Sequence, residues 1–129
     1  MSLTHITTED FKEKVFDYTQ EKEWKFKGSK PMIVDFYADW CGPCKMLTPV
    51  LEELATEYGS DVDIVKVDTE KETELSSVFG IRSIPSILFI PVDGQPMMQA
   101  GLLPKAAFED VITNQLLKAE PEVSEVEKE

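Results

Sequence analysis

The chain has 129 residues, which suits a single domain that buries a core without disulfide or metal cross-links. Its hydrophobic fraction is 42%, and no apolar run approaches the about 20 residues of a membrane-spanning helix, so membrane insertion is not expected. The net charge of -12 repels phosphate backbones and anionic lipids, which argues against nucleic-acid binding.

The N-terminal part of the chain predicts one helix and a long connection. Residues 7–20, "TTEDFKEKVFDYTQ", start with a threonine that can cap a helix. Phe11, Val15 and Tyr18 follow at helical spacing, so the helix is expected to be amphipathic. The charged segment 21–30, "EKEWKFKGSK", predicts a loop whose two aromatic side chains fold back onto the surface. The sequence assigns this loop no role.

A strand, a helix and a second strand follow. Residues 31–38, "PMIVDFYA", form a nearly unbroken apolar run, which is typical of a strand that is covered on both faces in a parallel sheet. From Pro43 to about Tyr58, apolar residues at helical spacing predict a helix that ends at Gly59. Residues 62–68, "VDIVKVD", predict the next buried strand, which completes a right-handed parallel crossover. The apolar positions of the helix are Met46, Leu47, Val50, Leu51, Leu54 and Tyr58.

The second half predicts a short helix, two antiparallel strands and a final helix. Residues 69–80 give a helix that ends at Gly80. Strands at 87–90 and 97–100 flank the Asp-Gly turn of "PVDGQP" and predict a hairpin. Residues 104–118 predict the last helix, which begins at a proline. Together these elements predict an α/β fold with a mixed central sheet of four to five strands, flanked by helices on both faces.

The end of the chain, residues 119–129, reads "AEPEVSEVEKE" and carries about a third of the net charge. With so little apolar content, it cannot offset its ordering entropy, and we expect an acidic disordered tail. The predicted domain therefore covers residues 1–118. No basic and apolar signal sequence opens the chain, so the sequence determines the compartment only weakly.

Both cysteines lie in residues 39–45, "DWCGPCK". With Pro43 at the first helical position, Cys41 caps the predicted helix, where unpaired backbone N–H groups and the helix dipole favour thiolate over thiol. Cys44 lies one turn further on, within disulfide range. We expect an exposed, acidic sulfur at Cys41 and a shielded sulfur at Cys44.

Three interpretations of this pair compete. A structural cross-link is the weaker interpretation, because a disulfide that closes a four-residue loop stabilises the fold by only about 2 kcal/mol through the entropy of the unfolded chain. A zinc site needs about four ligands, and beyond the two thiols the chain has a single histidine, His5, so no metal site is expected. A redox-active dithiol needs only the residues present, and Cys-x-x-Cys beside a parallel crossover favours it.

The pentapeptide "WCGPC", within "VDFYADWCGPCK", resembles the active-site motif of the thioredoxin family, and the similarity runs from about Ile6 to Leu117. The resemblance implies the thioredoxin fold. It also implies thiol–disulfide exchange through a redox disulfide between Cys41 and Cys44, with no cofactor. Four separate positions match further site residues of the family. These are Asp35, Lys66, Pro85 and Gly101.

Asp35 interrupts the first apolar strand, on the same face as Ile33 and Tyr37. A buried, unpaired carboxylate is costly, so this group should be protonated, paired or hydrated. The resemblance implies that Asp35 takes the proton of Cys44 through a water. Lys66, on a neighbouring strand, is the candidate charge partner, with a surface lysine at a strand end as the alternative.

Pro85, in "GIRSIPS", matches the family's cis-proline. A cis bond brings it beside Cys41 and exposes the backbone of Ile84, which can pair with an extended substrate segment as an added strand. Gly101 matches the glycine that lines the family's substrate groove. The implied substrate-binding residues are Trp40, Gly42, Pro43, Ile84, Pro85 and Gly101.

The predicted function is the reduction of disulfides in substrate proteins. Cys41 attacks the disulfide, Cys44 releases the reduced substrate, and a separate reductase regenerates the pair. The Gly-Pro dipeptide carries no cation, which favours reduction. The alternatives are an exported oxidant or isomerase on the same fold, and a non-catalytic binding subunit. Following the family, we expect a cytoplasmic monomer; the bacterial periplasm is the alternative if a signal peptide was removed.

Overall fold

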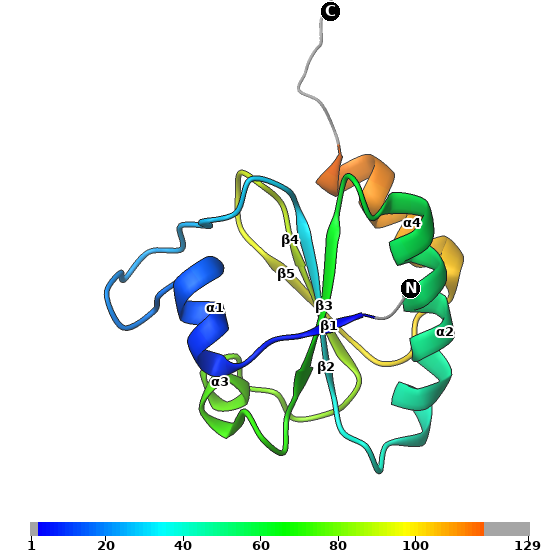
Figure 1. Cartoon of the computed structure of the whole chain (residues 1–129), viewed down its shortest axis with the longest axis horizontal. Helices are drawn as coiled ribbons and strands as arrows, with labels where there is room; N and C mark the ends of the chain where they lie inside the picture. Colours follow the sequence, from blue (N-terminus) through cyan, green and yellow to red (C-terminus); the bar gives the residue numbers. More distant parts are fainter. Residues whose placement is uncertain (1–2, 118–129) are drawn as a thin grey trace, which may run out of the picture.

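The computed structural model describes residues 3–117 (Figure 1). Within these residues, no helix has the length and apolar character to cross a membrane. The predicted tail, 119–129, and the predicted domain boundary before it lie outside the described residues. The elements in chain order are β1 (Thr4–His5), α1 (Thr8–Lys14), β2 (Met32–Tyr37), α2 (Gly42–Tyr58), β3 (Asp63–Asp68), α3 (Thr73–Val78), β4 (Ser86–Ile90), β5 (Met97–Ala100), α4 (Lys105–Val111) and the π-helix η1 (Ile112–Leu116).

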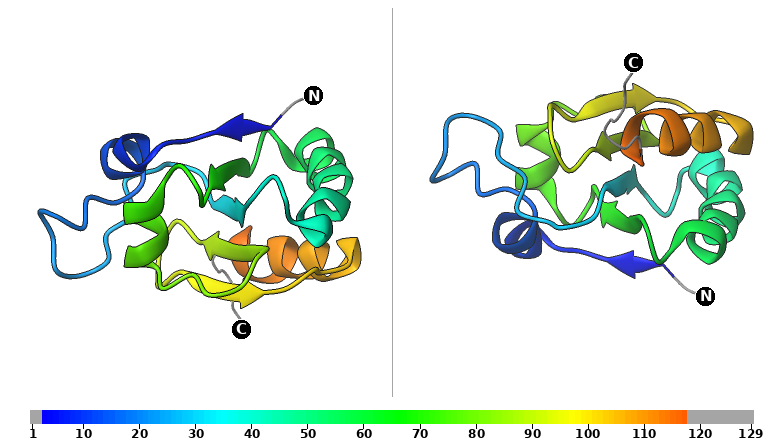
Figure 2. Two further views of the ribbon diagram at one scale, coloured as in Figure 1. Left: turned by 90° about the horizontal axis from the view of Figure 1, so that it is seen from below. Right: turned by 90° about the horizontal axis from the view of Figure 1, so that it is seen from above.

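The described strands form one mixed, 5-stranded sheet in the order β1-β3-β2-β4-β5. Strands β1, β3 and β2 run parallel, whereas β4 is antiparallel to both β2 and β5. Helices α1 and α3 cover one face of the sheet, and α2 and α4 cover the other (Figures 1 and 2). This arrangement confirms the α/β fold that the sequence predicts.

Strand β2 lies at the centre of the sheet, which explains its unbroken apolar run. All 6 of its residues are buried, and they alternate between the two faces. Ile33 belongs to the core between the sheet and α2 and α4. Its neighbours Met32 and Val34 belong to the core between the sheet and α1 and α3. The two cores lie on opposite faces of β2. The C-terminal end of this strand leads directly into the turn that carries Cys41.

Helix α1 is shorter than the sequence predicts. A capping box fixes its start, with Thr7 and Asp10 exchanging side chain–backbone hydrogen bonds of 3.0 Å. The helix then ends because the N–H of Phe16 bonds to the carbonyl of Phe11 at 3.0 Å, five residues back, instead of continuing the regular pattern. Tyr18, predicted on the apolar face of this helix, therefore lies beyond its end.

The loop predicted between α1 and β2 is present, and its aromatic side chains fold back as expected. The rings of Trp24 and Phe16 lie with centroids 4.8 Å apart. Phe26 packs against the same core. Figures 1 and 2 show this loop beside α1, on the face of the sheet opposite α2.

Helix α2 has the extent that the sequence predicts, and most of its apolar stripe faces the core. Its buried apolar residues include Leu47, Leu51 and Leu54. Met46 is the exception: it was expected on the apolar stripe but is 65% exposed. It follows the exposed Lys45 on the side of the helix that faces away from the sheet, so this prediction was wrong.

The final predicted helix is divided into α4 and η1. Pro104 is the N-cap of α4, so the helix begins where the sequence predicts. In η1, the N–H of Leu117 donates to the carbonyl of Ile112 at 2.8 Å, five residues back. The wider turn keeps both Ile112 and Leu116 in the core shared with α2.

Candidate active site

The two cysteines form a disulfide at the start of α2, with Cα atoms 5.3 Å apart. Cys41 is the N-cap residue of the helix, and its Sγ accepts a hydrogen bond of 3.2 Å from the backbone N–H of Cys44. Pro43 lies in the first turn, where its missing N–H costs no hydrogen bond. The predicted helix start at the cysteine pair is confirmed.

The predicted exposure of Cys41 is wrong. Cys41 is only 4% exposed, and Cys44 is 1% exposed. Both pack against Tyr37, Ala38 and Ile84. The turn into α2 explains this burial, because the N–H of Cys41 donates to the carbonyl of Ala38 at 3.1 Å and folds the cysteine back against the strand ends. The exposed surface here comes instead from Trp40, Gly42 and Pro43.

The loop before β4 lies beside the Sγ of Cys41, together with the end of β2 and the start of α2. The Ile84–Pro85 peptide bond is cis, as the resemblance implies, and the carbonyl oxygen of Ile84 lies 3.7 Å from Cys41 Sγ. Gly101 follows β5 with φ 100°, a conformation that favours glycine, and donates its N–H to the Pro85 carbonyl at 2.8 Å. Three segments far apart in the sequence therefore meet beside the disulfide.

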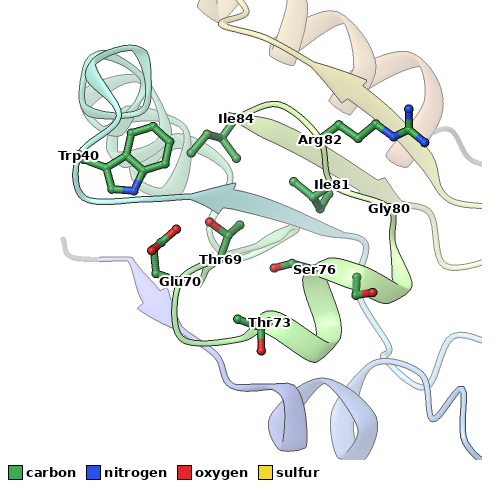
Figure 3. Close-up of a pocket in the computed structure, with 10 residues that line it drawn as sticks. Trp40, Thr69, Glu70, Thr73, Ser76, Gly80, Ile81, Arg82 and Ile84 are labelled. Carbon is green, nitrogen blue, oxygen red and sulfur yellow. The ribbon is translucent and has the colours of Figure 1, made fainter.

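An open groove of about 570 Å³ adjoins this point. Figure 3 shows Trp40 and Ile84 along one side and residues from the loop after β3 and from α3 along the other. Trp40 is 69% exposed, so its ring is available to a partner. The sequence did not predict the side of the groove opposite Trp40, which includes Glu70 and Ser76, because these residues belong to no motif. Only the pairing of β3 with β2 brings them beside Trp40.

Asp35 is fully buried in β2, and neither of its carboxylate oxygens has a hydrogen-bonding partner among the described residues. Burial raises the pKa of Asp35 to about 7, while the positive charge of Lys66 acts in the opposite direction. The two residues are register partners in the parallel pair β2–β3, so their side chains leave the same face of the sheet, which α2 covers. An acid with this pKa can exchange protons near neutral pH.

The Lys66 ammonium contacts Thr48 and Tyr37, and it forms no ion pair with Asp35. Its Nζ donates a hydrogen bond of 3.2 Å to Thr48 Oγ1 on α2 and lies 4.2 Å from the centre of the Tyr37 ring. Lys66 is 8% exposed, which excludes the alternative of a surface lysine. The expected charge partner of Asp35 therefore acts through space, and sequence reasoning did not foresee the contribution of Thr48.

A cavity of about 200 Å³ opens between the start of α2 and the ends of β2 and β3. Its lining includes Cys44, Thr48 and Lys66. A water molecule takes up about 30 Å³ of the liquid, so several waters fit there and can reach the inner cysteine from this side. Among residues 3–117, no group of three or more His, Cys, Asp or Glu side chains is placed to hold a metal ion.

Comparisons with known proteins agree with this geometry. A sequence model described as "Thioredoxin" matches residues 2–114. The chain belongs to the thioredoxin family. It is 55% identical over 107 residues to a thioredoxin of Borreliella burgdorferi, covering 83% of this chain and 92% of the relative. It is 34% identical over 106 residues to a thioredoxin of Pyropia yezoensis, covering 82% and 90% respectively. A crystal structure of chloroplastic thioredoxin z is similar with a TM-score of 0.76 and 28% identity, covering 92% of this chain and 97% of the other.

Family membership and the disulfide at the helix start determine the class of chemistry. This thioredoxin-family chain is a thiol–disulfide oxidoreductase of the protein-disulfide-reductase type, and it acts on disulfide substrates. That activity is the one that the sequence predicts. None of these findings favours an exported oxidant or isomerase, or a binding subunit with idle cysteines.

Proposed function

We propose that this chain reduces disulfides in other proteins with Cys41 as the attacking sulfur and Cys44 as the resolving one. The position of Cys41 carries the proposal: it caps α2, and its Sγ accepts the N–H of Cys44 at 3.2 Å. In the reduced chain, the same N–H and the helix dipole stabilise a thiolate at Cys41. Cys44 lies one turn deeper, so it reacts after Cys41 has captured the substrate.

The reaction consists of two exchange steps. The Cys41 thiolate attacks one sulfur of the substrate disulfide, forms a mixed disulfide and releases the other substrate sulfur as a thiolate. Cys44 then gives its proton to the Asp35 carboxylate, and the Cys44 thiolate attacks Cys41 Sγ. This attack breaks the mixed disulfide, so the substrate leaves reduced by two electrons and the Cys41–Cys44 disulfide remains. Asp35 suits the proton transfer because burial raises its pKa to about 7.

The substrate segment docks on the surface around Cys41. The Ile84 backbone, whose carbonyl lies 3.7 Å from Cys41 Sγ, can pair with an extended peptide as an added strand. Trp40 offers an exposed aromatic face at the groove (Figure 3). Gly101 has no side chain to obstruct the peptide on the other side. Because Cys41 is 4% exposed, the substrate sulfur reaches it only between these neighbours.

A second partner must return electrons to the disulfide. The two residues between the cysteines, Gly42 and Pro43, carry no positive charge. A cation there would stabilise the thiolate of the reduced form and make the pair more oxidising. Its absence therefore favours a reducing potential. A separate dithiol or a flavin-linked reductase supplies the electrons. We place the reaction in the cytoplasm, where such systems keep thiols reduced.

Trapping with Cys44→Ser tests the proposal. Incubated with insulin as a defined disulfide substrate, this variant accumulates a mixed disulfide through Cys41, because no second thiol releases the adduct. Cys41→Ser is the matched control and accumulates none. Adducts that form on Cys41→Ser instead, or on neither variant, contradict the assignment of the attacking sulfur.

A further inference from the structure

Lys66 and Asp35 are a buried base and a buried acid that do not pair. They are direct register partners on the same face of the sheet, and their exposed fractions are 8% and 0%. Buried charges are as a rule paired with each other or with hydrogen-bonding groups. Within residues 3–117, however, the carboxylate of Asp35 has no hydrogen-bonding partner, and the ammonium of Lys66 is directed elsewhere.

Thr48 accounts for the direction of the Lys66 side chain. Its Oγ1 donates a hydrogen bond of 3.3 Å to the carbonyl of Cys44, four residues earlier on α2, and accepts one of 3.2 Å from Lys66 Nζ. A β-branched side chain has few rotamers in a helix, so the first bond fixes where the second can form. The Tyr37 ring, 4.2 Å from Nζ, closes the other side of the ammonium.

We propose that Thr48 is a positioning residue for the resolving step: its hydroxyl holds the Lys66 ammonium against Tyr37 and α2, away from Asp35, and thereby leaves the carboxyl free to accept the proton of Cys44. This inference deepens the proposed function and rests on it. In the transfer, the S–H bond of Cys44 breaks, an O–H bond forms on Asp35, and the Cys44 thiolate attacks Cys41 Sγ as described above.

The electrostatic reason is the steep dependence of a buried interaction on distance. Burial raises the pKa of Asp35 to about 7, although the charge of Lys66, which forms no hydrogen bond with the Asp35 oxygens, already lowers that pKa. An ammonium within about 4–6 Å of a carboxylate lowers the carboxyl pKa by about one to three pH units. A Lys66 side chain released from Thr48 can turn to its register partner, and Asp35 then becomes a weaker base for Cys44.

On β4, the register partner of Asp35 is the apolar Ile87, whereas β1, β2, β3 and α2 contribute titratable groups to this region. Burial and the carboxylates of Asp68 and Asp39 raise the pKa of Tyr37, so its phenol stays neutral near neutral pH. His5 of β1 is the register partner of Lys66, and its ring centroid lies 5.6 Å from that of Tyr37. The facing groups are His5, Tyr37, Asp39, Cys44, Lys45, Lys66 and Asp68.

The test is a carbon-13 titration of the Asp35 carboxyl in the oxidised full chain, in which the cysteines do not titrate, with His5→Gln as the common background. Thr48→Val removes the hydroxyl at nearly constant shape, and Thr48→Ala provides a second variant without it. Both are expected to lower the Asp35 titration midpoint by about one pH unit or more. Thr48→Ser keeps the hydroxyl and is expected to keep the parent midpoint.

A Lys66→Met background separates this role from a general structural effect. There, Thr48→Val is expected to leave the midpoint unchanged, because no ammonium remains to be positioned. An unchanged midpoint in both hydroxyl-free variants overturns the proposal, as does a shift that persists without Lys66. The titration involves no turnover, so its failure is distinct from a failure of the Cys44→Ser trapping experiment.

Discussion

The carbonyl oxygen of Ile84 lies 3.7 Å from the Sγ of Cys41, although the two residues are 43 positions apart in the sequence. This contact joins the loop before β4 to the start of α2. A peptide that pairs with the Ile84 backbone is therefore brought within reach of the reactive sulfur. Substrate binding and thiol–disulfide exchange are therefore expected to take place on one small surface around Cys41.

Trp40→Ala is expected to weaken the binding of protein substrates. Trp40 is 69% exposed beside the groove, so truncating it removes contact area for a partner while costing the fold little. We expect KM for insulin reduction to rise about tenfold, with little change in the rate on a small aromatic disulfide. The matched control is Met46→Ala, which truncates a side chain that is 65% exposed on α2. Equal effects of the two variants would contradict the role of Trp40.

Pro43→His is expected to make the dithiol more oxidising. An imidazolium beside Cys41 stabilises the thiolate of the reduced form, so the reduction potential becomes less negative by about 30 mV for each tenfold change in the exchange equilibrium. Redox titration against glutathione measures this shift. Pro43→Gln controls for the loss of proline without adding charge. A shift of the same size with glutamine rules out the electrostatic explanation.

Asp35→Asn is expected to change how stability depends on pH. Folding raises the pKa of Asp35 from 3.8 to about 7, so the folded state binds the proton more tightly than the unfolded state. The wild type therefore loses stability as pH rises between about 4 and 7. Each pH unit corresponds to about 1.4 kcal/mol, so above pH 7 the variant should be more stable by up to about 4 kcal/mol.

Urea unfolding of the oxidised proteins at pH 4 and pH 8 measures this difference. At the lower pH, the Asp35 carboxyl is protonated in the folded chain and partly protonated in the unfolded chain, because pH 4 lies close to the unfolded pKa of 3.8. The advantage of Asp35→Asn should therefore largely vanish. An advantage of equal size at both pH values is incompatible with titration of Asp35 near neutral pH.

Trp24→Ala is expected to destabilise the fold without affecting the chemistry. Trp24 packs on Phe16 and against the core between the sheet and α1 and α3, away from the cysteines, so its loss should cost about 1–3 kcal/mol and leave insulin reduction unchanged. Urea unfolding and turnover are measured on the same samples. The exposed neighbour Lys25, changed to alanine, should alter neither property. A loss of turnover at unchanged stability would instead assign this loop a role in function.

The sequence was most informative where structure follows from local or periodic causes. A proline in the first turn and a glycine after the last one bracket α2, and the unbroken apolar run marks β2 as a central strand. The Asp-Gly turn likewise marks the β4–β5 hairpin. The cysteine motif predicted a helix start at the cysteine pair after β2, and the structure has the disulfide there.

What the sequence could not predict depends on contacts between distant segments. Cys41 is buried because Ile84 and the strand ends pack around it, and no pattern near the motif reports that packing. Lys66 has a long, flexible side chain, so its register opposite Asp35 does not determine where its ammonium lies. The position of the ammonium depends instead on its hydrogen bond to the Thr48 hydroxyl on α2.

The rate at which iodoacetamide alkylates each cysteine of the reduced chain, measured by mass spectrometry near pH 6, tests the central claim most directly. A cysteine whose thiolate is stabilised at a helix start reacts where an ordinary thiol is almost fully protonated. We predict that Cys41 reacts at least about tenfold faster than free cysteine and that Cys44 reacts more slowly than Cys41. If Cys41 reacts no faster than free cysteine, the helix start does not activate it, and the proposed mechanism is wrong.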